Sequence, residues 1–429
     1  MVLGSSAVGD APPPSGLVVT GRTARLDALE WIALAKGGGG NAGASAGASA
    51  EHDKGLPLRR IDIGSDRLWL LGAEFADARL QVVPADGALA VAVQGPALAG
   101  NLRMPDAGGA VITGKFSRVH WRARPQVPAA GEAPTGGNPP ASEADPAGMP
   151  PLALDIDDLR FGQARLGSAI LRTQPVPAGM RLRQLALRSE GQRIDIEGEW
   201  TGRGAAARTR MSTAIASEDF GQLLDAFGFE GQVAGGRGDV RFDAGWDGTP
   251  AAFSLAALQG RLQIDARAGQ LLELEPGAGR VLGLLGIAQL PRRMLLDFRD
   301  FFSKGFAFDR IQGTVGIGAG IARSDQLAID GPAARIQISG STDLRAQRFD
   351  QTIEVQPKSG NLLTVVGAFA GGPLGAAVGA AANAVLSKPL GEIGAKTYRV
   401  TGPWKDPQVD VVGRQSRPPA GAADAPGAP

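Results

Sequence analysis

Apolar residues alternate with polar or small ones along most of this chain, and this period of two restricts its fold more than any other feature. The pattern is clearest between Gly279 and Gly340, where the pairs Val315 and Ile317, and Ile336 and Ile338, each fall on one face. Successive side chains of a strand point to opposite faces, so each such run predicts a half-buried strand. Roughly fifteen to twenty such runs occur, which predicts a mainly β protein with a few helices.

A set of strands with one apolar face each must hide that face. Three arrangements do so: a sandwich, a barrel, or one long curved sheet whose inner wall is covered by something else. The expected number of strands exceeds what a flat sheet holds without curling. The alternation by itself leaves these three arrangements open.

Changes of composition divide the chain into sections. Residues 37–50 are a run of Gly, Ala and Ser, and residues 125–151 are rich in Pro, Gly, Ala and acidic residues that bury little apolar area. We expect a strand and short helix in 1–37, a flexible linker in 38–55, a β-sheet section in 56–124, a disordered linker in 125–151, a β-sheet section in 152–275, a C-terminal section in 276–413, and a disordered tail in 414–429.

Helical spacing appears in only a few places. Asp27 is expected to cap a helix over 27–36, and Ser217 one over 217–227. A third apolar helix is expected at 280–290, where Pro291 ends it. The segment 359–387 carries no charge, and its helical part is expected at 361–387.

Two of these helical segments are candidate caps or membrane contacts. Arg292 and Arg293 follow the helix at 280–290, either as a solvated pair or as contacts of lipid phosphates. A glycine every fourth residue in 361–387 makes a small-residue stripe, while Pro373 interrupts the helix. This segment is a packed or kinked helical hairpin, a membrane-surface or membrane-inserted element, or a loop. The candidate contacts are Leu284, Leu285, Arg292, Arg293, Gly371 and Gly375.

Composition excludes several classes of function. Lys and Arg number 44 against 43 for Asp and Glu, a net charge of +1 that lacks the basic footprint of a nucleic-acid binder. The chain has no cysteine, which excludes disulfides, thiolate metal sites and a cysteine nucleophile.

Side chains able to do chemistry are present but form no recognisable site. Neither His52 nor His120 has a second ligand at metal-binding spacing. Asp297 and Asp300 are typical of a helix cap and a solvated face. Gly316, Gly318 and Gly320 resemble the start of a phosphate loop, but the third glycine at the required offset and the following helix are missing. We therefore expect no catalytic residue, no metal and no cofactor.

Longer stretches of the sequence resemble a known family. Residues 284–357, from LLGIAQLPRRMLLDF to FDQTIEVQP, resemble the C-terminal part of the AsmA-like envelope proteins, specifically the YhdP branch. The run Trp246, Gly248, Pro250, Leu258 and Gly260 resembles a W-x-G-x-P…L-x-G pattern of that family. GLVVTGRTARLDALEW, GGPLGAAVGAAANAVLSKPL and YRVTGPWKDPQVD resemble it too. The resemblance covers most of 16–413 and is weaker before Leu152.

The resemblance implies a fold and a function. Members of the family are Gram-negative envelope proteins on the periplasmic side, anchored in the inner membrane and implicated in phospholipid transport and the outer-membrane barrier. We expect an elongated, curved antiparallel sheet with a groove and with C-terminal helices capping one end. Partners would be phospholipid acyl chains and a membrane surface or envelope proteins. The sequence shows neither a signal peptide nor a membrane anchor, so we expect the C-terminal portion of a longer protein.

The alternation and the resemblance point to one mechanism. A sheet with every second side chain apolar supplies an apolar lining for lipid tails while its other face stays wet. The candidate lining residues are Val315, Ile317, Leu327, Ile329, Ile336, Ile338, Ile353 and Val355. Two other classes compete with this hypothesis: a structural β-scaffold with a closed core, and an enzyme such as a β-sandwich hydrolase.

Overall fold

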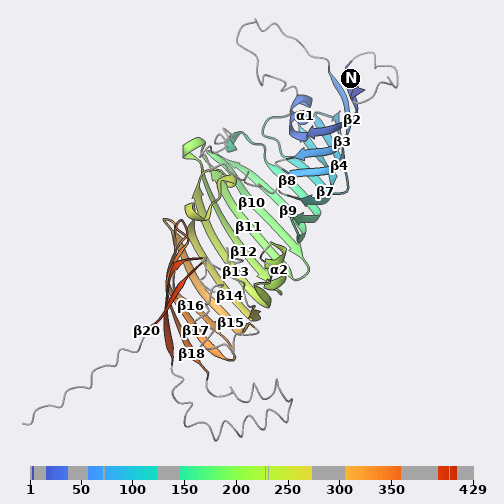
Figure 1. The fold of residues 1–429 in the computed structure, drawn as a ribbon. Helices are drawn as coiled ribbons and strands as arrows, with labels where there is room; N and C mark the ends of the chain where they lie inside the picture. The colour runs from blue at the N-terminus through green and yellow to red at the C-terminus, as the bar shows by residue number, and fades with distance from the viewer. Residues whose placement is uncertain are drawn as a thin grey trace, which may run out of the picture. The chain divides into compact units, whose positions relative to one another are not determined.

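The computed structural model describes residues 2–3, 16–36, 57–70, 73–122, 145–227, 229, 231–272, 305–358, 395–404 and 406–412. Within these ranges the chain forms twenty β-strands, two α-helices and four short 3-10 helices (Figure 1). The prediction of a mainly β fold with an open antiparallel sheet and few helices is confirmed. The helices expected at 280–290 and 361–387, with their six candidate cap residues, lie outside the described residues.

The chain divides into two compact units, one of residues 1–272 with 316–320 and one of 273–315 with 321–429. The strands of the first unit are β1 (Val2–Leu3), β2 (Leu17–Asp27), β3 (Leu58–Leu70), β4 (Ala73–Ala85), β5 (Ala88–Gln94), β6 (Leu98–Pro105), β7 (Ile112–Trp121), β8 (Leu152–Phe161), β9 (Ala164–Val176), β10 (Gly179–Ser189), β11 (Gln192–Thr201), β12 (Arg208–Ser217), β13 (Val233–Asp247) and β14 (Gln259–Leu271).

Most neighbouring strands of the first unit pair antiparallel in chain order, but three pairs are parallel: β1 with β2, β2 with β3, and β7 with β8. Antiparallel neighbours need only a tight turn, whereas a parallel neighbour needs a crossover of about a dozen residues or more. The β2–β3 and β7–β8 connections contain the two stretches expected as linkers. Most of both stretches lies outside the described residues, and β3 and β8 each start beside the beginning of the strand before them.

Residues 145–151 of the second expected linker are among the described residues. The 3-10 helix η1 (Pro146–Gly148) falls within it, and Asp145 Oδ1 accepts a hydrogen bond of 3.0 Å from the amide of Ala147. Asp145 also pairs with Arg203 at 3.3 Å. An N-cap and an ion pair thus order residues that composition alone assigned to disorder.

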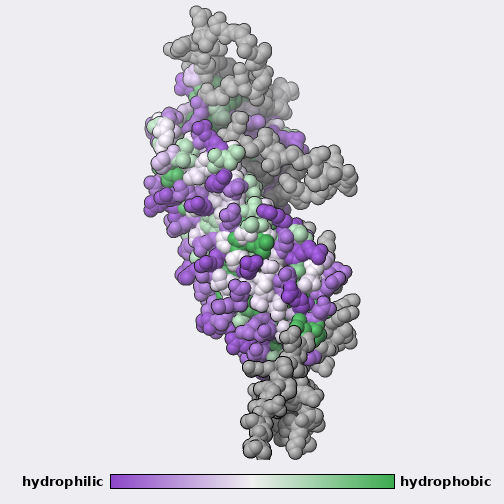
Figure 2. Space-filling view, turned by 90° about the vertical axis from the view of Figure 1, so that its left-hand side faces the viewer, coloured by the Kyte–Doolittle hydropathy of each residue, from purple (hydrophilic) through white to green (hydrophobic). Residues whose placement is uncertain are grey.

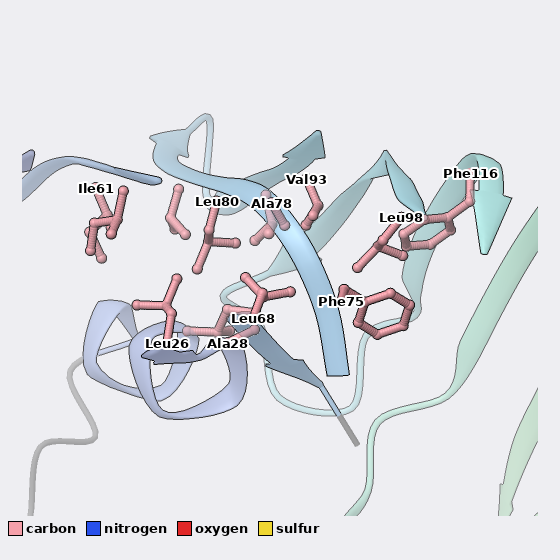
Figure 3. Close-up of a cluster of buried hydrophobic side chains, with 14 of the residues drawn as sticks. Leu26, Ala28, Ile61, Leu68, Phe75, Ala78, Leu80, Val93, Leu98 and Phe116 are labelled. Atoms are coloured by element: carbon pink, nitrogen blue, oxygen red, sulfur yellow. The ribbon is translucent and has the colours of Figure 1, made fainter. Parts of the chain in front are cut away.

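A helix covers the apolar face of β2–β7 over β3 and β4. Helix α1 (Ala28–Ala35) begins at Asp27, whose carboxylate accepts from the amides of Leu29 and Glu30, which confirms the predicted cap. The helix lies on the strands, and Leu26, Ala28 and Leu68 gather between them (Figure 3). Ile61 is fully buried. This section of the sheet has a dry core.

A shorter helix lies on the apolar face of β8–β14. Helix α2 (Phe220–Ala226) is capped by Asp219, whose carboxylate accepts from the Gln222 amide at 2.9 Å. The expected cap at Ser217 is wrong by two residues, because Ser217 ends strand β12 and its Oγ accepts from the Asp219 amide at 3.1 Å. The remaining 3-10 helices are η2 (Gly204–Ala206), η3 (Pro250–Ala252) and η4 (Leu255–Ala257).

The second unit is an antiparallel meander. Its strands are β15 (Phe306–Gly318, of which 306–315 belong to this unit), β16 (Ile321–Asp330), β17 (Ala334–Asp343), β18 (Arg348–Pro357), β19 (Lys396–Pro403) and β20 (Gln408–Val412). Ser324 Oγ on β16 donates to the Thr314 carbonyl on β15 at 2.9 Å. The polar side of these strands is exposed, with an Asp350–Arg399 ion pair of 2.5 Å across β18 and β19.

The buried carboxylate of Asp62 links neighbouring side chains within the first unit. The Asp62 side chain on β3 is 6% exposed and receives hydrogen bonds from Arg79 at 2.5 and 2.9 Å, from Gln81 at 3.2 Å, and from Arg60. Burial alone would raise the pKa of Asp62, but the hydrogen bonds from Arg79, Arg60 and Gln81 outweigh it and lower the pKa below the usual range.

Asp62→Asn is expected to lower the free energy of unfolding by roughly 2 kcal/mol at pH 7, because it weakens hydrogen bonds to a buried charge. Since the folded pKa is lowered, this contribution is complete above the unfolded pKa of about 4 and is lost as the pH falls through the folded value. Denaturant unfolding at pH 7 and at pH 3 measures both effects.

Asp66→Asn is the matched control, because Asp66 pairs with Arg22 on the surface and its side chain is 55% exposed. Its loss is expected to cost less than about 1 kcal/mol. Equal costs for the two variants, or a cost for Asp62→Asn that does not shrink at acidic pH, would contradict the assignment.

Candidate functional site

The apolar face of β8–β14 is built from rows of side chains that cross the strands. In an antiparallel sheet, directly paired residues lie on the same face and touch. One such row, called the long row, joins seven strands through consecutive pairs. Its members are Leu154, Leu171, Leu185, Ile196, Thr213, Phe242 and Leu262.

Every side chain of the long row is half-buried, whereas the core of β2–β7 is dry. Burying a large apolar side chain stabilises a fold by about 1.5–3 kcal/mol. An apolar side chain that stays half-buried therefore gains about 1 kcal/mol less than it would if it were fully buried. An apolar surface that continues over neighbouring strands marks an interaction site more often than scattered apolar residues do. The long row is therefore the first element of the candidate site.

A second row beside it is covered by α2 over part of its length. Its members, called the covered row, are Ile156, Ala169, Leu187, Ile194, Ile215, Val240 and Ile264. Leu223 of α2 packs on Ala169, Leu187 and Ile194. The helix approaches closely because Gly221 has no side chain: a Cβ there would lie 2.5 Å from the Val233 carbonyl oxygen. Helix α2 thus borders the open part of the face on one side.

On the other side of the long row runs a line of mostly small residues, called the furrow. It consists of Leu182, Gly198, Met211, Ala244 and Gly260, paired in that order across β10–β14. Gly260 accepts no side chain, because a Cβ would lie 1.9 Å from the carbonyl oxygen of Asp243. At Gly260 the floor of the furrow is therefore formed by the backbone, between rows of bulkier side chains.

The far wall of the furrow is the aromatic rim, formed by Met180, Trp200, Thr209 and Trp246 in consecutive cross-strand pairs. Trp246 packs edge-on against Phe253 with ring centroids 5.3 Å apart. Its Nε1 donates to the Thr249 carbonyl at 2.9 Å. Phe253 is 49% exposed, so the rim reaches the water-facing edge of the apolar face.

The opposite face of the same strands is charged. Ion pairs cross it between Arg172 and Asp155 at 2.6 Å, Arg181 and Glu199 at 3.3 Å, Arg188 and Asp195 at 2.5 Å, and Arg208 and Asp247 at 3.0 Å. A depression of about 930 Å³ over β10–β14 is lined by four arginines and four carboxylates of this face together with the five residues of the furrow, Thr209 and Trp246. Balanced charge of this kind offers no preference for a charged ligand.

Figure 2 shows a face of the molecule on which hydrophilic side chains predominate and hydrophobic ones form small patches. Apolar side chains of β8–β14 instead collect in the rows described above.

The eight residues expected to line a groove lie on β15–β18, and all are buried, with at most 6% of each exposed. Leu327 pairs with Ile338 and Ile329 with Ile336, while Ile336 pairs with Val355 and Ile338 with Ile353. Val315 and Ile317 lie two residues apart on β15. The structure thus brings six of them together as one apolar patch.

Reasoning from the sequence missed the face that stands half-open. Leu185, Leu187, Ile194 and Ile196 show the alternation plainly, but nothing in the pattern separates a covered strand from an open one. The rows through Thr213 and Gly260 depend on which residues pair, and a register shift beside Leu182 helps to set that pairing. A run of small residues at matching positions of successive strands is the signal that reveals the furrow once the register is known.

His120 is one of the two histidines that the sequence analysis considered as metal ligands. Its Nε2 lies 2.7 Å from Asp158 Oδ2 across the parallel pair β7 and β8, and Arg160 lies 3.1 Å from the same oxygen. Burial alone would raise the pKa of Asp158, but the bonds from His120 and Arg160 lower it. Within the described residues no three acidic or histidine side chains converge as metal ligands.

These features define a class of protein: a β-sheet protein with one charged face and one apolar face, the latter closed in one section and half-open in another. Among the residues described, no helix is both long and apolar enough to cross a membrane. Comparison with known proteins makes the class specific. A model of the YhdP protein family matches residues 3–409, and the chain belongs to that family.

A curated relative is described as the intermembrane phospholipid transporter YhdP of Escherichia coli (strain K12). It is 30% identical to this chain over 226 residues, which are 52% of this chain and 18% of the relative. The chain therefore matches less than a fifth of that protein's length. No solved structure matches the chain.

Leu223→Ala is expected to loosen α2 from the covered row at a cost of about 2 kcal/mol, since it removes the buried anchor of a short helix. Hydrogen exchange over α2 should accelerate, and binding of an environment-sensitive apolar dye should rise. Gln222→Ala, on the exposed side of the same helix, is the control and should change neither. Indistinguishable behaviour of the two variants would show that α2 does not cover the face through Leu223.

Proposed function

We propose that this chain is a non-enzymatic, lipid-conducting segment of the Gram-negative cell envelope, and that phospholipid tails lie on the half-open apolar face of β8–β14. The observation that carries the proposal is the long row, a line of half-buried side chains that are apolar except for Thr213, beside a furrow of mostly small residues. The family, and the description of its relative as a phospholipid transporter, support the same conclusion.

Physical chemistry explains why such a face suits lipid. Exposing an acyl chain to water costs about 0.8 kcal/mol per CH₂, so a lipid crosses an aqueous gap readily only along an apolar lining. The required lining is not chemically specific. A sheet of this kind needs apolar rows on one face and polar side chains on the opposite face. It needs no catalytic group.

The dimensions of the face fit an extended tail. Seven strands spaced about 4.8 Å apart make a row of about 29 Å. One leaflet of a bilayer has a hydrocarbon depth of about 15 Å. The furrow crosses the five strands β10–β14, about 19 Å, so a tail lying along it would stay on the sheet over its whole length.

In a longer protein this face would be one part of a periplasmic path between inner and outer membrane, and the path would serve the outer-membrane permeability barrier. Partners would be the membrane surfaces or envelope proteins at its two ends. The apolar patch of the second unit, with Ile336 and Ile353 at its centre, is proposed as a further lipid contact. Because it is buried, lipid would reach it only after the patch opens.

A structural β-scaffold is the second candidate, and one observation favours it. The core of β2–β7 is dry and closed by α1, as a scaffold requires. In β8–β14 the same kind of face has only the short helix α2 on it, and this difference favours lipid binding for that section.

Site-specific photo-crosslinking tests the proposal. A photoreactive phenylalanine analogue at Phe242, on the long row, should capture phospholipid in cells of a Gram-negative host or in vesicle mixtures. The same analogue at Asp243, the next residue on the charged face, should capture little.

An analogue at Ile353 tests the second unit, where capture is expected to be weaker than at Phe242 because the patch is buried. Equal capture at positions 242 and 243 in folded protein would contradict the assignment of the lipid face. No capture at either position would favour the scaffold.

A further inference from the structure

The long row divides the half-open face into two tracks. On one side of it lies the furrow, whose floor carries small residues such as Gly198 and Gly260. On the other side lies the covered row, called the second track, which crosses the same strands two residues further along each of them, about 6.6 Å from the long row. Carbon atoms pack about 4 Å apart, so each track has the width of one hydrocarbon chain.

Helix α2 occupies only part of the second track. Leu187 and Ile194, which lie beneath it on β10 and β11, are 6% and 5% exposed. Ile215, Val240 and Ile264 continue the same row on β12–β14 and are only half-buried. The second track is therefore open over β12–β14, a length of about 10 Å, and is filled by the helix over β9–β11.

Few interactions hold α2 on the sheet. The helix has seven residues, too few to be stable by itself in water, and Leu223 is its one large side chain that is buried. At its start, the Asp219 carbonyl accepts a hydrogen bond of 3.2 Å from Gln192 Nε2. Beyond its end, Asp225 accepts from the amide of Gly231 at 3.0 Å, and the φ of +70° at Gly231 favours glycine. The helix can therefore leave the sheet while β12 and β13 stay paired.

A lipid with two tails needs both tracks over the same strands. Its tails start from one glycerol and run side by side, so a second tail beside one in the furrow lies on the second track. A tail of about 15 Å is longer than the open part of that track and reaches α2 at β11. Its hydrocarbon can cover Leu187 and Ile194 in place of Leu223, which keeps them dry after the helix has left. A lipid with one tail fits in the furrow and leaves α2 in place.

We propose that α2 is a displaceable gate that distinguishes lipids by their number of tails: two-tailed phospholipids displace it from the covered row, whereas single-tailed lysophospholipids bind while it stays seated. This inference rests on the proposed function and deepens it. It names diacyl lipids as the substrates that open the second track, and Leu223 as the residue that sets how readily the track opens.

Paired spin labels test the movement, because the chain has no cysteine of its own. Labels at Gln222→Cys on α2 and at Glu197→Cys on β11, both exposed positions, report the distance between helix and sheet. Vesicles of phosphatidylethanolamine are expected to lengthen this distance, and lysophosphatidylethanolamine with the same acyl chain to leave it unchanged. A pair at Glu197→Cys and Arg241→Cys, both on the charged face of the sheet, is the control and should respond to neither lipid.

Binding of the same two lipids tests the role of Leu223. Leu223→Ala makes opening easier, so the folded variant is expected to bind the diacyl lipid about tenfold more tightly, with wild-type affinity for the lyso form. Gln222→Ala, on the exposed side of α2, is the matched control and should change neither affinity.

A helix–sheet distance that both lipids change equally, or that neither changes while both bind, overturns the gate and leaves the proposed function intact. The same holds for a Leu223→Ala variant whose affinities for the two lipids shift alike or not at all. Failure of the folded wild type to bind either lipid overturns both the gate and the proposed function.

Discussion

The hydrophobic effect is the constraint on which this structure depends. Nearly every strand has one apolar side, which must be either covered or left exposed to water at a cost in free energy. The three sections meet this requirement differently. Helix α1 and the strands β2–β7 enclose a dry core. The patch around Ile336 and Ile353 in the second unit is equally buried. Strands β8–β14 stop short of that, since α2 covers only part of the covered row and the whole long row stays half-buried.

Strands β8–β14 leave part of their apolar face uncovered. Their other interactions offset the free energy that this costs. Consecutive antiparallel pairs satisfy the backbone hydrogen bonds from β8 to β14, and ion pairs such as Arg172 with Asp155 cross the charged side. The exposed apolar surface is then available for a ligand that itself avoids water. A hydrophobic tail and a half-open row each complete the burial that the other lacks, which is why no reactive group is needed.

Much of this could be predicted from the sequence. The alternation through Ile336, Ile338 and Ile353 predicts strands and their buried side, and Asp27 predicts the start of α1. The parallel pairs could not be predicted, because a period of two contains no information about the direction of a neighbouring strand. Nor could the furrow, since Gly198, Ala244 and Gly260 are far apart in the chain and meet only through register.

Native mass spectrometry of the purified, folded chain tests the central claim most directly, namely that the half-open face of β8–β14 holds phospholipid. The account predicts protein ions that carry whole phospholipid masses, strongly reduced by Ile196→Asp together with Phe242→Asp on the long row. The same ions should persist in Ser212→Asp, a variant of the charged face between the same strands. Folded wild-type protein that takes up no lipid from vesicles, or lipid retained equally by all these proteins, would contradict the claim.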